Sequence, residues 1–515
     1  MPQPRQPLII NHLSLTINNA VHPHNITIHH NYHQLPLSCY YIWYQILNKM
    51  KKLIGVLIVT FIGAFWSLNA QDLTGDWNGE LEVQGMKLPL VFHITKNDQT
   101  LSTNLDSPLQ GAKDIPTGST LQINDSIYVF IPALGAKYAG KLQEDKLIGI
   151  FSQGGLTLPL TLSRGSASKA FNRPQEPKEP FPYLVEEVTF KNPKANNITF
   201  GGTLTLPKNV KNPPVAILIS GSGGQNRDEE LLGHKPFLVI ADYLTRKGIA
   251  VLRYDDRGIA SSEAYVPLGF KDNTTLDFAL DAEAAFDYLK TRKDAVDIRK
   301  IGFIGHSEGG LIAPIVASQR KDIAFCILLA GPGVNGTEVL LTQARRNGEL
   351  AGEKEEFIAV NETYTKKIYE IIHAKPADEK AKIKVLFKEL LDKYPGSMEG
   401  VTEKSIDAQI ASLTSDWMRT FMKLEPSVYL TEVQCPVLAI NGEKDFQVLP
   451  KINLPGIEQA LQKGKNKDFT IKELPNLNHL FQNSQTGAFS EYGQIEETIS
   501  PIALELMFNW LKERF

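Results

Sequence analysis

A serine between glycines stands where the sequence changes from a predicted strand to a predicted helix. The segment Gly305-His306-Ser307-Glu308-Gly309 follows the apolar run IGFI and precedes the apolar run LIAPIVASQ. A G-x-S-x-G sequence in this setting forms a sharp turn that exposes the serine hydroxyl, and glycines flank it because larger side chains would clash. The pattern therefore predicts that Ser307 is a nucleophile, with Gly305 and Gly309 shaping its turn.

A nucleophilic serine needs a base to take its proton and an acid to orient that base. Asp445 follows the predicted strand PVLAI, and His479 lies in the loop PNLNHLF after the predicted strand FTIKEL. The order serine, acid, histidine is typical of proteins with this kind of turn. Among the histidines after residue 70, only His479 both follows Asp445 and lies in such a loop. Glu443 is the alternative acid, since either carboxylate type serves there.

The oxyanion formed in acyl transfer needs two preorganised hydrogen-bond donors. One predicted donor is the backbone N–H of Glu308, directly after the nucleophile. The other is expected in the loop after an early strand, Ser220-Gly221-Ser222-Gly223-Gly224, where we favour the N–H of Ser222. The alternative is that this glycine-rich segment is only a flexible turn.

Two other motifs resemble functional sites but are predicted to be structural. Residues 331–336 read GPGVNG and match G-x-G-x-x-G, but a strand-poor region follows instead of the βαβ unit that a dinucleotide site requires. In RYDDRG (253–258), we expect Asp255 or Asp256 to form an ion pair with Arg257 that ties loops together. No metal or organic cofactor is required by the predicted chemistry.

These candidates are carried by a predicted α/β region, residues 185–515. Short apolar runs bounded by Gly and Pro alternate with helical segments, which is typical of an open, doubly wound and mostly parallel sheet. The alternation stops at about 335–428, a charged and helix-rich stretch that we interpret as a lid inserted over the strand ends. Its candidate pocket-lining residues, which could equally pack on the core, are Trp417, Met418, Phe421 and Met422.

The region before the α/β part has a different character. Residues 71–168 show period-two alternation in runs such as WNGELEVQG and LPLVFHITK, which predicts a small all-β barrel or sandwich. Residues 169–184 contain the proline-rich run RPQEPKEPFPY and are predicted to form a stiff linker.

The first 70 residues contain no Asp or Glu and hold six of the eleven histidines. We interpret 1–49 as a start-site artefact and 50–70, a basic start followed by LIGVLIVTFIGAFW, as a signal peptide cleaved near Gln71. The apolar run is short for a membrane span, although an uncleaved anchor is the alternative. The histidines fit no zinc pattern, so an unstructured extension is favoured over a metal-binding tract. The protein is therefore expected to be exported, periplasmic or secreted.

Charge and cysteine content exclude several classes of function. The net charge is −3, and loss of the leader removes only cations, so no basic stripe remains for nucleic acid. Cys326 and Cys435 lie in apolar strand-like runs, where packing is expected and a disulfide stays open. Oligomeric state is not addressed by the sequence.

The segments ISGSGGQNRDE, LRYDDRG, GHSEGG, PVLAINGEKDFQVLP and LNHLFQ resemble bacterial α/β-hydrolases of the EstD-type esterase group, which overlaps serine aminopeptidase-like hydrolases. The similarity spans about 183–515, and the N-terminal β region looks like one that precedes exported members. The resemblance implies an α/β-hydrolase fold, a Ser307–Asp445–His479 triad and cleavage of short acyl esters. At Gly258-Ile259-Ala260-Ser261 the sequence departs from the group, which usually has a second glycine in this loop.

Three functions are therefore expected, in order. The first is hydrolysis of a small-molecule carboxylic ester through an acyl-enzyme. The second is an aminopeptidase-like peptidase on the same scaffold, which would need an acidic pair to hold a free amine. The third is a non-catalytic protein that binds a glycan or a partner, against which the complete set of catalytic residue types argues.

Overall fold

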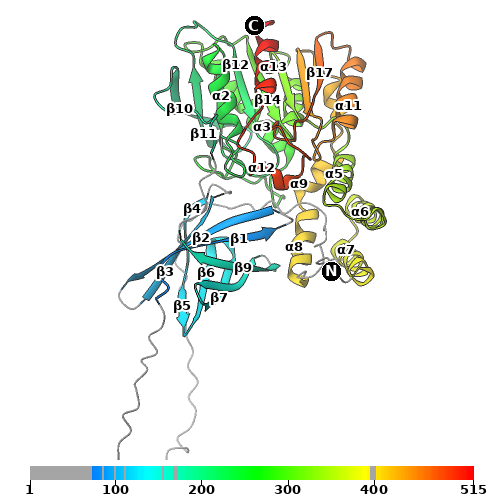
Figure 1. The fold of residues 1–515 in the computed structure, drawn as a ribbon. Coiled ribbons are helices and arrows are strands. Elements are labelled where there is room, and N and C mark those ends of the chain that lie inside the picture. Colours follow the sequence, from blue (N-terminus) through cyan, green and yellow to red (C-terminus); the bar gives the residue numbers. More distant parts are fainter. Residues whose placement is uncertain are drawn as a thin grey trace, which may run out of the picture. The chain divides into compact units, whose positions relative to one another are not determined.

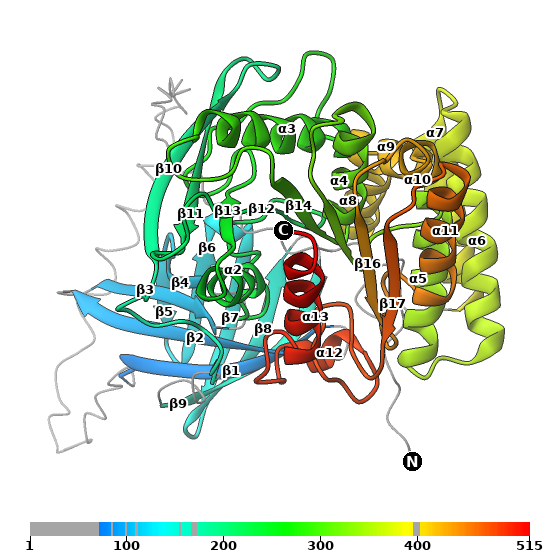
Figure 2. The same ribbon diagram turned by 90° about the horizontal axis from the view of Figure 1, so that it is seen from above.

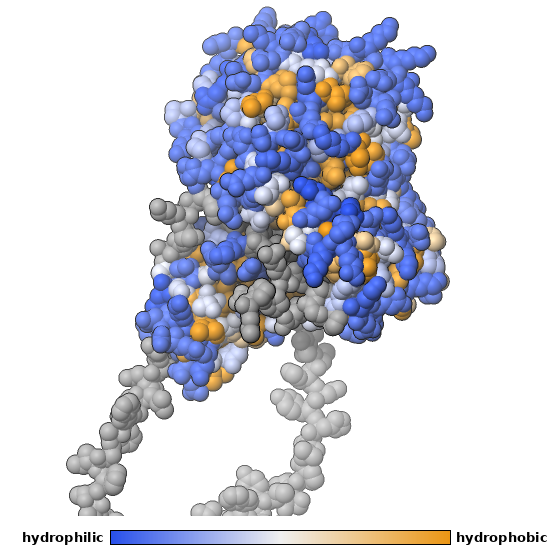
Figure 3. Space-filling model, turned by 45° about the vertical axis from the view of Figure 1, so that its right-hand side comes forward, coloured by the Kyte–Doolittle hydropathy of each residue, from blue (hydrophilic) through white to orange (hydrophobic). Residues whose placement is uncertain are grey.

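The fold is described from a computed structural model, which covers residues 72–83, 86–97, 100–108, 112–153, 156–165, 172–394 and 402–515. The expected start-site artefact, signal peptide and histidine-rich tract lie outside these residues. In the described ranges, every helix is too short or too polar to cross a membrane. Residues 73–515 fall within one compact unit. On the face drawn in Figure 3, hydrophilic residues predominate, with smaller groups of apolar residues between them.

The N-terminal part is a closed antiparallel barrel (Figure 1). The strand order is β2-β1-β9-β8-β7-β6-β5-β3, and β2 also pairs with β3, which closes the ring. The expectation of a barrel or sandwich is thereby resolved in favour of the barrel. Its strands are β1 (Gly75–Val83), β2 (Met86–Asn97), β3 (Thr100–Ser107), β4 (Ala112–Pro116), β5 (Thr120–Ile123), β6 (Ser126–Ile131), β7 (Ala136–Gln143), β8 (Lys146–Gln153) and β9 (Leu156–Arg164).

Alternation of buried and exposed residues along the strands builds the barrel interior. β7, for example, alternates almost strictly between the two environments. Trp77, Phe92 and Tyr138 are buried inside, and the Tyr138 hydroxyl donates to the carbonyl of Leu147 at 2.9 Å. The same buried cluster includes four residues of the α/β part, Leu232, Phe446, Leu480 and Tyr492.

The α/β part is built on an eight-stranded sheet with the order β10-β11-β13-β12-β14-β15-β16-β17. Only β11 runs against the others, because it pairs antiparallel with both β10 and β13. The predicted open, mostly parallel sheet is thus confirmed. Its strands are β10 (Leu184–Asn192), β11 (Ile198–Leu206), β12 (Val215–Ile219), β13 (Ala250–Tyr254), β14 (Ile301–His306), β15 (Cys326–Leu329), β16 (Val437–Gly442) and β17 (Phe469–Leu474).

Helices cover both faces of this sheet (Figure 2). One face is packed by α2 (Pro236–Arg246) and α13 (Pro501–Lys512). The other is packed by α3 (Thr275–Thr291), α4 (Gly309–Gln319) and α11 (Pro450–Lys463). The central strands are buried on both sides, which is why they read as continuous apolar runs.

Between β15 and β16, the described residues form six inserted helices. The lid stretch expected from the sequence at about 335–428 corresponds to this insertion, whose helices pack on one another and on α3. They are α5 (Gly336–Leu350), α6 (Glu355–Ala374), α7 (Glu379–Lys393), α8 (Glu403–Leu413), α9 (Asp416–Lys423) and α10 (Pro426–Leu430).

Candidate active site

Ser307 occupies a strained turn between β14 and α4. Its backbone φ is 52°, a left-handed conformation that non-glycine residues rarely adopt. Its N–H donates to the carbonyl of Leu329 on the next strand at 2.8 Å. A Cβ at Gly305 would lie 2.0 Å from the carbonyl oxygen of Gly309, and one at Gly309 would lie 2.1 Å from that of Ile219. Glycine is therefore required at both flanking positions, because the turn is packed against its own backbone and against β12.

Asp445 and His479 meet at the carboxyl ends of β16 and β17. The His479 Nδ1 lies 2.8 Å from Asp445 Oδ2, and both side chains are almost completely buried. The other carboxylate oxygen of Asp445 accepts hydrogen bonds from the N–H groups of Gln447 at 2.7 Å and Val448 at 2.9 Å. Because Nδ1 faces a carboxylate, it carries the proton, which leaves Nε2 of His479 free to act as a base.

The nucleophile turn lies beside this pair. The ring of His306, directly before Ser307, is 4.8 Å from the ring of His479 between centroids. In the described part of the chain, no hydrogen bond joins the Ser307 hydroxyl to His479, and such a contact often forms only when substrate binds. The structure thus gathers the elbow, the acid and the histidine in one place, while the proton transfer between them stays a prediction.

The glycine-rich loop after β12 passes close to the nucleophile. A Cβ at Gly221 would lie 3.3 Å from the Cβ of Ser307. The N–H of Gly221 is already used, since it donates to Oε1 of Glu229 at 2.8 Å. The next amide in the loop belongs to Ser222, which is exposed. This arrangement is compatible with Ser222 and Glu308 as the oxyanion donors, an assignment that stays a prediction.

Comparison with known proteins agrees with this geometry. Residues 236–485 match the family described as "Serine aminopeptidase, S33". Together with the strand order and the serine turn, this match decides the fold family. The α/β part of the chain has the α/β-hydrolase fold.

A curated relative of the hydrolase is the esterase EstD of Thermotoga maritima. It is 27% identical over 222 residues, which are 42% of this chain and 52% of EstD. The chain therefore matches only about half the length of this relative.

Similar solved structures include the esterase Pf2001 of Pyrococcus furiosus and Est1E of Butyrivibrio proteoclasticus with bound ferulic acid. Pf2001 is 16% identical, with 64% of this chain and 93% of that chain covered and a TM-score of 0.37. Est1E is 19% identical, with 64% and 98% covered and a TM-score of 0.37.

The carboxylate of Glu308, the residue after Ser307, is fully enclosed. Thr275 Oγ1 donates to it at 2.5 Å, and Trp417 Nε1 donates to its two oxygens at 2.9 and 3.1 Å. Burial raises the pKa of Glu308, while hydrogen bonds from Thr275, Trp417 and Ser222 act in the opposite direction. The sequence had suggested Trp417 only as pocket lining, and its link to Glu308 was missed because nothing in the spacing connects α9 with the serine turn.

The other three candidate lining residues are core residues. Met418 and Met422 are fully buried and Phe421 is 5% exposed, all in the cluster that joins the lid to α3 and α4. Their packing holds α9 against α3, α5 and α8. Trp417, on the same helix, is different, because its indole N–H donates to the Glu308 carboxylate in the serine turn.

The prediction of an ion pair within RYDDRG is wrong. Asp255 pairs instead with Arg227 at 2.8 Å, and Arg257 pairs with Asp281 of α3 at 2.6 Å. Neighbouring side chains at the end of a strand point in different directions, so each finds its partner on another element. Asp256 accepts hydrogen bonds from Ser220 Oγ and holds the start of the glycine-rich loop.

Glu443, the alternative acid, is engaged elsewhere. Its Oε2 accepts a hydrogen bond from the N–H of Asn476 at 3.0 Å. The GPGVNG motif has a packing role, since a Cβ at Gly333 would lie 1.9 Å from the carbonyl oxygen of Asn453 on α11. A Cβ at Gly336 would lie 2.0 Å from the carbonyl oxygen of Phe421. Close helix packing therefore explains these glycines.

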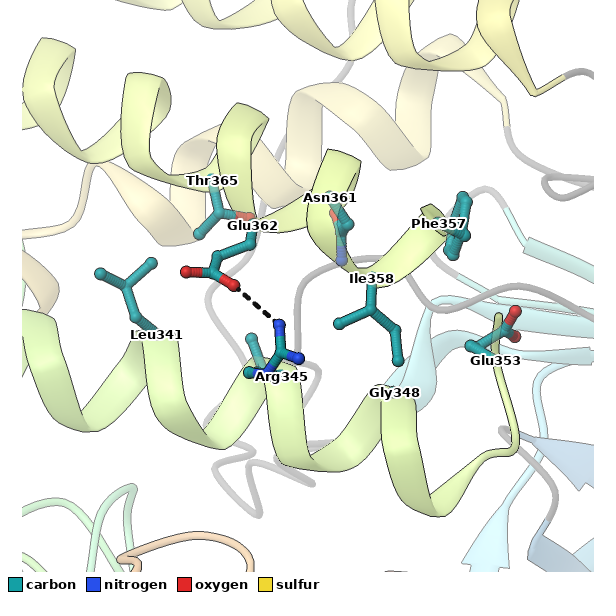
Figure 4. A pocket seen from close by; sticks show the side chains of 10 residues that line it. Leu341, Arg345, Gly348, Glu353, Phe357, Ile358, Asn361, Glu362 and Thr365 are labelled. Carbon is teal, nitrogen blue, oxygen red and sulfur yellow. Dashed lines mark hydrogen bonds and ion pairs between the residues drawn. The ribbon is translucent and has the colours of Figure 1, made fainter. Parts of the chain in front are cut away.

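A pocket lies away from this chemistry, between α5 and α6 (Figure 4). Residues of the lid alone line it, and an ion pair between Arg345 and Glu362 at 3.1 Å crosses it. Among the described residues, no three His, Cys, Asp or Glu side chains gather as a metal site requires. Cys326 and Cys435 are free thiols whose sulfur atoms lie 3.9 Å apart.

Proposed function

We propose that the protein hydrolyses carboxylic esters with short acyl groups through an acyl-enzyme on Ser307. The supporting observation is the left-handed turn at Ser307 beside the buried Asp445–His479 pair. In this mechanism His479 Nε2 takes the Ser307 proton as the hydroxyl oxygen attacks the ester carbonyl. The same nitrogen then returns the proton to the leaving alcohol.

Asp445 holds the imidazole in the tautomer that leaves Nε2 free and stabilises the imidazolium that forms. The backbone N–H groups of Ser222 and Glu308 stabilise the tetrahedral oxyanion. A water molecule, activated by His479, then cleaves the acyl-Ser307 ester by the reverse sequence of proton transfers. The relative EstD, named as an esterase, supports the choice of an ester substrate.

Two carboxylates beside the nucleophile speak against the peptidase alternative. An aminopeptidase must pair the free amine of its substrate with acidic groups. Glu308 is fully enclosed and accepts hydrogen bonds from Thr275 and Trp417. Glu229 is equally buried, and its Oε1 accepts from the Gly221 N–H. Neither carboxylate is free to receive an ammonium group.

The preference for short acyl groups rests on the lid. Met418, Phe421 and Met422 are packed into the core and present no apolar surface to a long acyl chain. Burying each methylene of an acyl chain contributes about 0.8 kcal/mol, and these three side chains are not free to supply that gain.

The decisive experiment labels and assays the wild type, Ser307→Ala and a control, Ser318→Ala. Ser318 lies at the other end of α4, where its hydroxyl donates to the carbonyl of Ile315. We expect a fluorophosphonate to add once to the wild type and to Ser318→Ala but not to Ser307→Ala, as measured by intact mass. Turnover of p-nitrophenyl acetate and butyrate should follow the same pattern.

Aminoacyl anilides are assayed in parallel. Turnover dominated by anilides would assign the enzyme to the peptidases. Label or ester turnover that persists in Ser307→Ala would refute the proposed nucleophile.

We also propose that the protein is exported, on the basis of the predicted leader at 50–70. N-terminal sequencing of the protein recovered outside the cytoplasm should begin near Gln71. A mature protein that retains the histidine-rich stretch would contradict this proposal.

A further inference from the structure

A second acid–histidine pair lies directly behind the first. The Nδ1 of His306 is 2.9 Å from Glu229 Oε1, and both side chains are more than nine-tenths buried. The Nε2 of the same ring is 3.0 Å from the backbone carbonyl oxygen of His479. A residue adjacent to the nucleophile is thus bonded to the loop that carries the catalytic base.

The partners of His306 determine its protonation state. A carboxylate and a peptide carbonyl are both acceptors, so each ring nitrogen must carry a hydrogen for both bonds to form. A neutral imidazole has only one N–H and would leave one of these buried contacts without a donor. A neutral imidazole would satisfy both contacts only if Glu229 were protonated and donated to Nδ1. The raised pKa of His306 favours instead an imidazolium paired with the Glu229 carboxylate, an arrangement that also satisfies the charge of both groups.

Glu229 extends the network to the oxyanion side of the site. Its Oε1 accepts from the N–H of Gly221 at 2.8 Å as well as from His306. To place its carboxylate there, the backbone of Glu229 adopts a left-handed φ of 51°. Such a conformation costs on the order of 1 kcal/mol in a non-glycine residue and persists only where surrounding contacts hold it.

We propose that the Glu229–His306 ion pair is a positioning unit that fixes the Ser222 oxyanion loop and the His479 loop relative to Ser307. This inference rests on the proposed function, because it assigns those two loops to the reaction. Glu229 holds Gly221, which precedes Ser222, and His306 holds the backbone of His479. One charged pair thereby sets the distance between the group that stabilises the oxyanion and the group that moves the proton.

The pair should also impose a pH dependence. The titratable groups facing His306 are Glu229, His479 and, further away, Asp445. Burial alone would lower the pKa of His306, but Glu229, the His479 carbonyl and Asp445 outweigh it and the pKa is raised. A raised histidine pKa contributes stability that is present below about pH 6.5 and is lost as the pH rises through the folded-state value.

The variants Glu229→Gln and His306→Asn test the proposal, with Glu230→Gln as the matched control. Glu230 is the next residue, and its side chain accepts a hydrogen bond from Asn226 Nδ2 at 3.3 Å. We expect kcat for ester hydrolysis to fall about 10- to 100-fold in each test variant with little change in KM, because a small misplacement of reacting groups slows the chemical step. The control should match the wild type.

Two further readouts separate positioning from simple structural damage. The alkaline fall of kcat should move to lower pH in Glu229→Gln, since the imidazolium loses its counter-ion. The double variant Glu229→Gln/His306→Asn should be no slower than the slower single variant, because both changes break one unit. Losses of kcat that add up in the double variant, or an alkaline fall of kcat that stays at the same pH in Glu229→Gln, would overturn the proposal.

An NMR measurement decides the protonation state independently of catalysis. In protein labelled with 15N-histidine, His306, assigned from its loss in His306→Asn, should show both ring nitrogens protonated at pH 7. A neutral ring at that pH would refute the ion pair, whether or not the variants fold well. Ester turnover that survives in Ser307→Ala would instead refute the proposed function, and the NMR result would still decide the state of the pair.

Discussion

The indole N–H of Trp417 in the inserted helix α9 donates to the carboxylate of Glu308, the residue that directly follows the proposed nucleophile Ser307. This contact joins the inserted helices to the serine turn through the carboxylate of Glu308, a residue that is 1% exposed. Because Glu308 also provides a predicted oxyanion N–H, the position of the lid is coupled to the position of that donor.

Replacement of Trp417 by Phe should weaken this coupling. The change leaves a buried carboxylate short of one donor, which typically costs about 1–3 kcal/mol. We expect a lower free energy of unfolding in urea and a lower kcat/KM. Trp510→Phe is the control. Trp510 lies on α13, and its indole N–H donates to the hydroxyl of Thr470 on β17. The control variant should lower the free energy of unfolding without changing kcat/KM. An equal loss of kcat/KM in both variants would argue against coupling between the inserted helices and the serine turn.

The left-handed backbone at Ser307 predicts an unusual stability order among inactive variants. Glycine tolerates a φ of 52° without the steric penalty that a Cβ imposes, which is about 1 kcal/mol or more. Ser307→Gly should therefore be at least as stable as Ser307→Ala, although a glycine normally gives a lower folding stability than an alanine at the same position. Thermal unfolding of the two variants checks this. A clearly less stable Ser307→Gly would mean that the turn is not strained.

The choice of catalytic acid can be settled by two isosteric changes. Asp445→Asn should leave the fold intact but reduce kcat by several orders of magnitude, up to about 10⁴-fold, because His479 loses the partner that fixes its tautomer. Glu443→Gln should keep near-normal kcat, since Glu443 only accepts from the Asn476 N–H. Steady-state kinetics with a p-nitrophenyl ester gives the answer, and the reverse ranking would exchange the two roles.

Stability at acid pH should depend on His234. Burial, with a smaller contribution from Arg173, lowers the pKa of His234 to about 4. The unfolded chain binds this proton near pH 6.5, so stability should fall as the pH drops from about 6.5 to 4. Urea titrations across this range measure the effect. His234→Gln should flatten the slope, and an unchanged slope would exclude His234 as its source.

Local sequence contained the main catalytic candidates. Ser307 could be found because a strand, a glycine-bounded turn and a helix are consecutive in the chain. Asp445 and His479 could be found because each follows a strand whose carboxyl end must lie at the same edge of a parallel sheet. The topology of the fold, not the residues between them, makes these separated positions neighbours.

Contacts between side chains could not be derived in the same way. Asp255 and Arg257 are two residues apart in the sequence, but they bond Arg227 and Asp281 on other elements. From the sequence we predicted an ion pair within the DDR run. That prediction was wrong because the direction of each side chain depends on where the strand ends in the sheet. Glu229 lies in a segment that carries the family resemblance, but its contact with His306 could not be predicted, because that contact depends on a loop that folds back onto His306.

The sequence by itself determined the order of strands and helices, the serine turn and the candidates for acid and base, because these depend on periodicity and on local backbone requirements. The tertiary structure alone decided that the β region closes into a barrel and that Trp417 reaches Glu308. It also decided that Glu229 and His306 form a buried contact behind His479. Such contacts join residues far apart in the chain, and their geometry exists only once the packed sheet and its loops fix every side-chain direction.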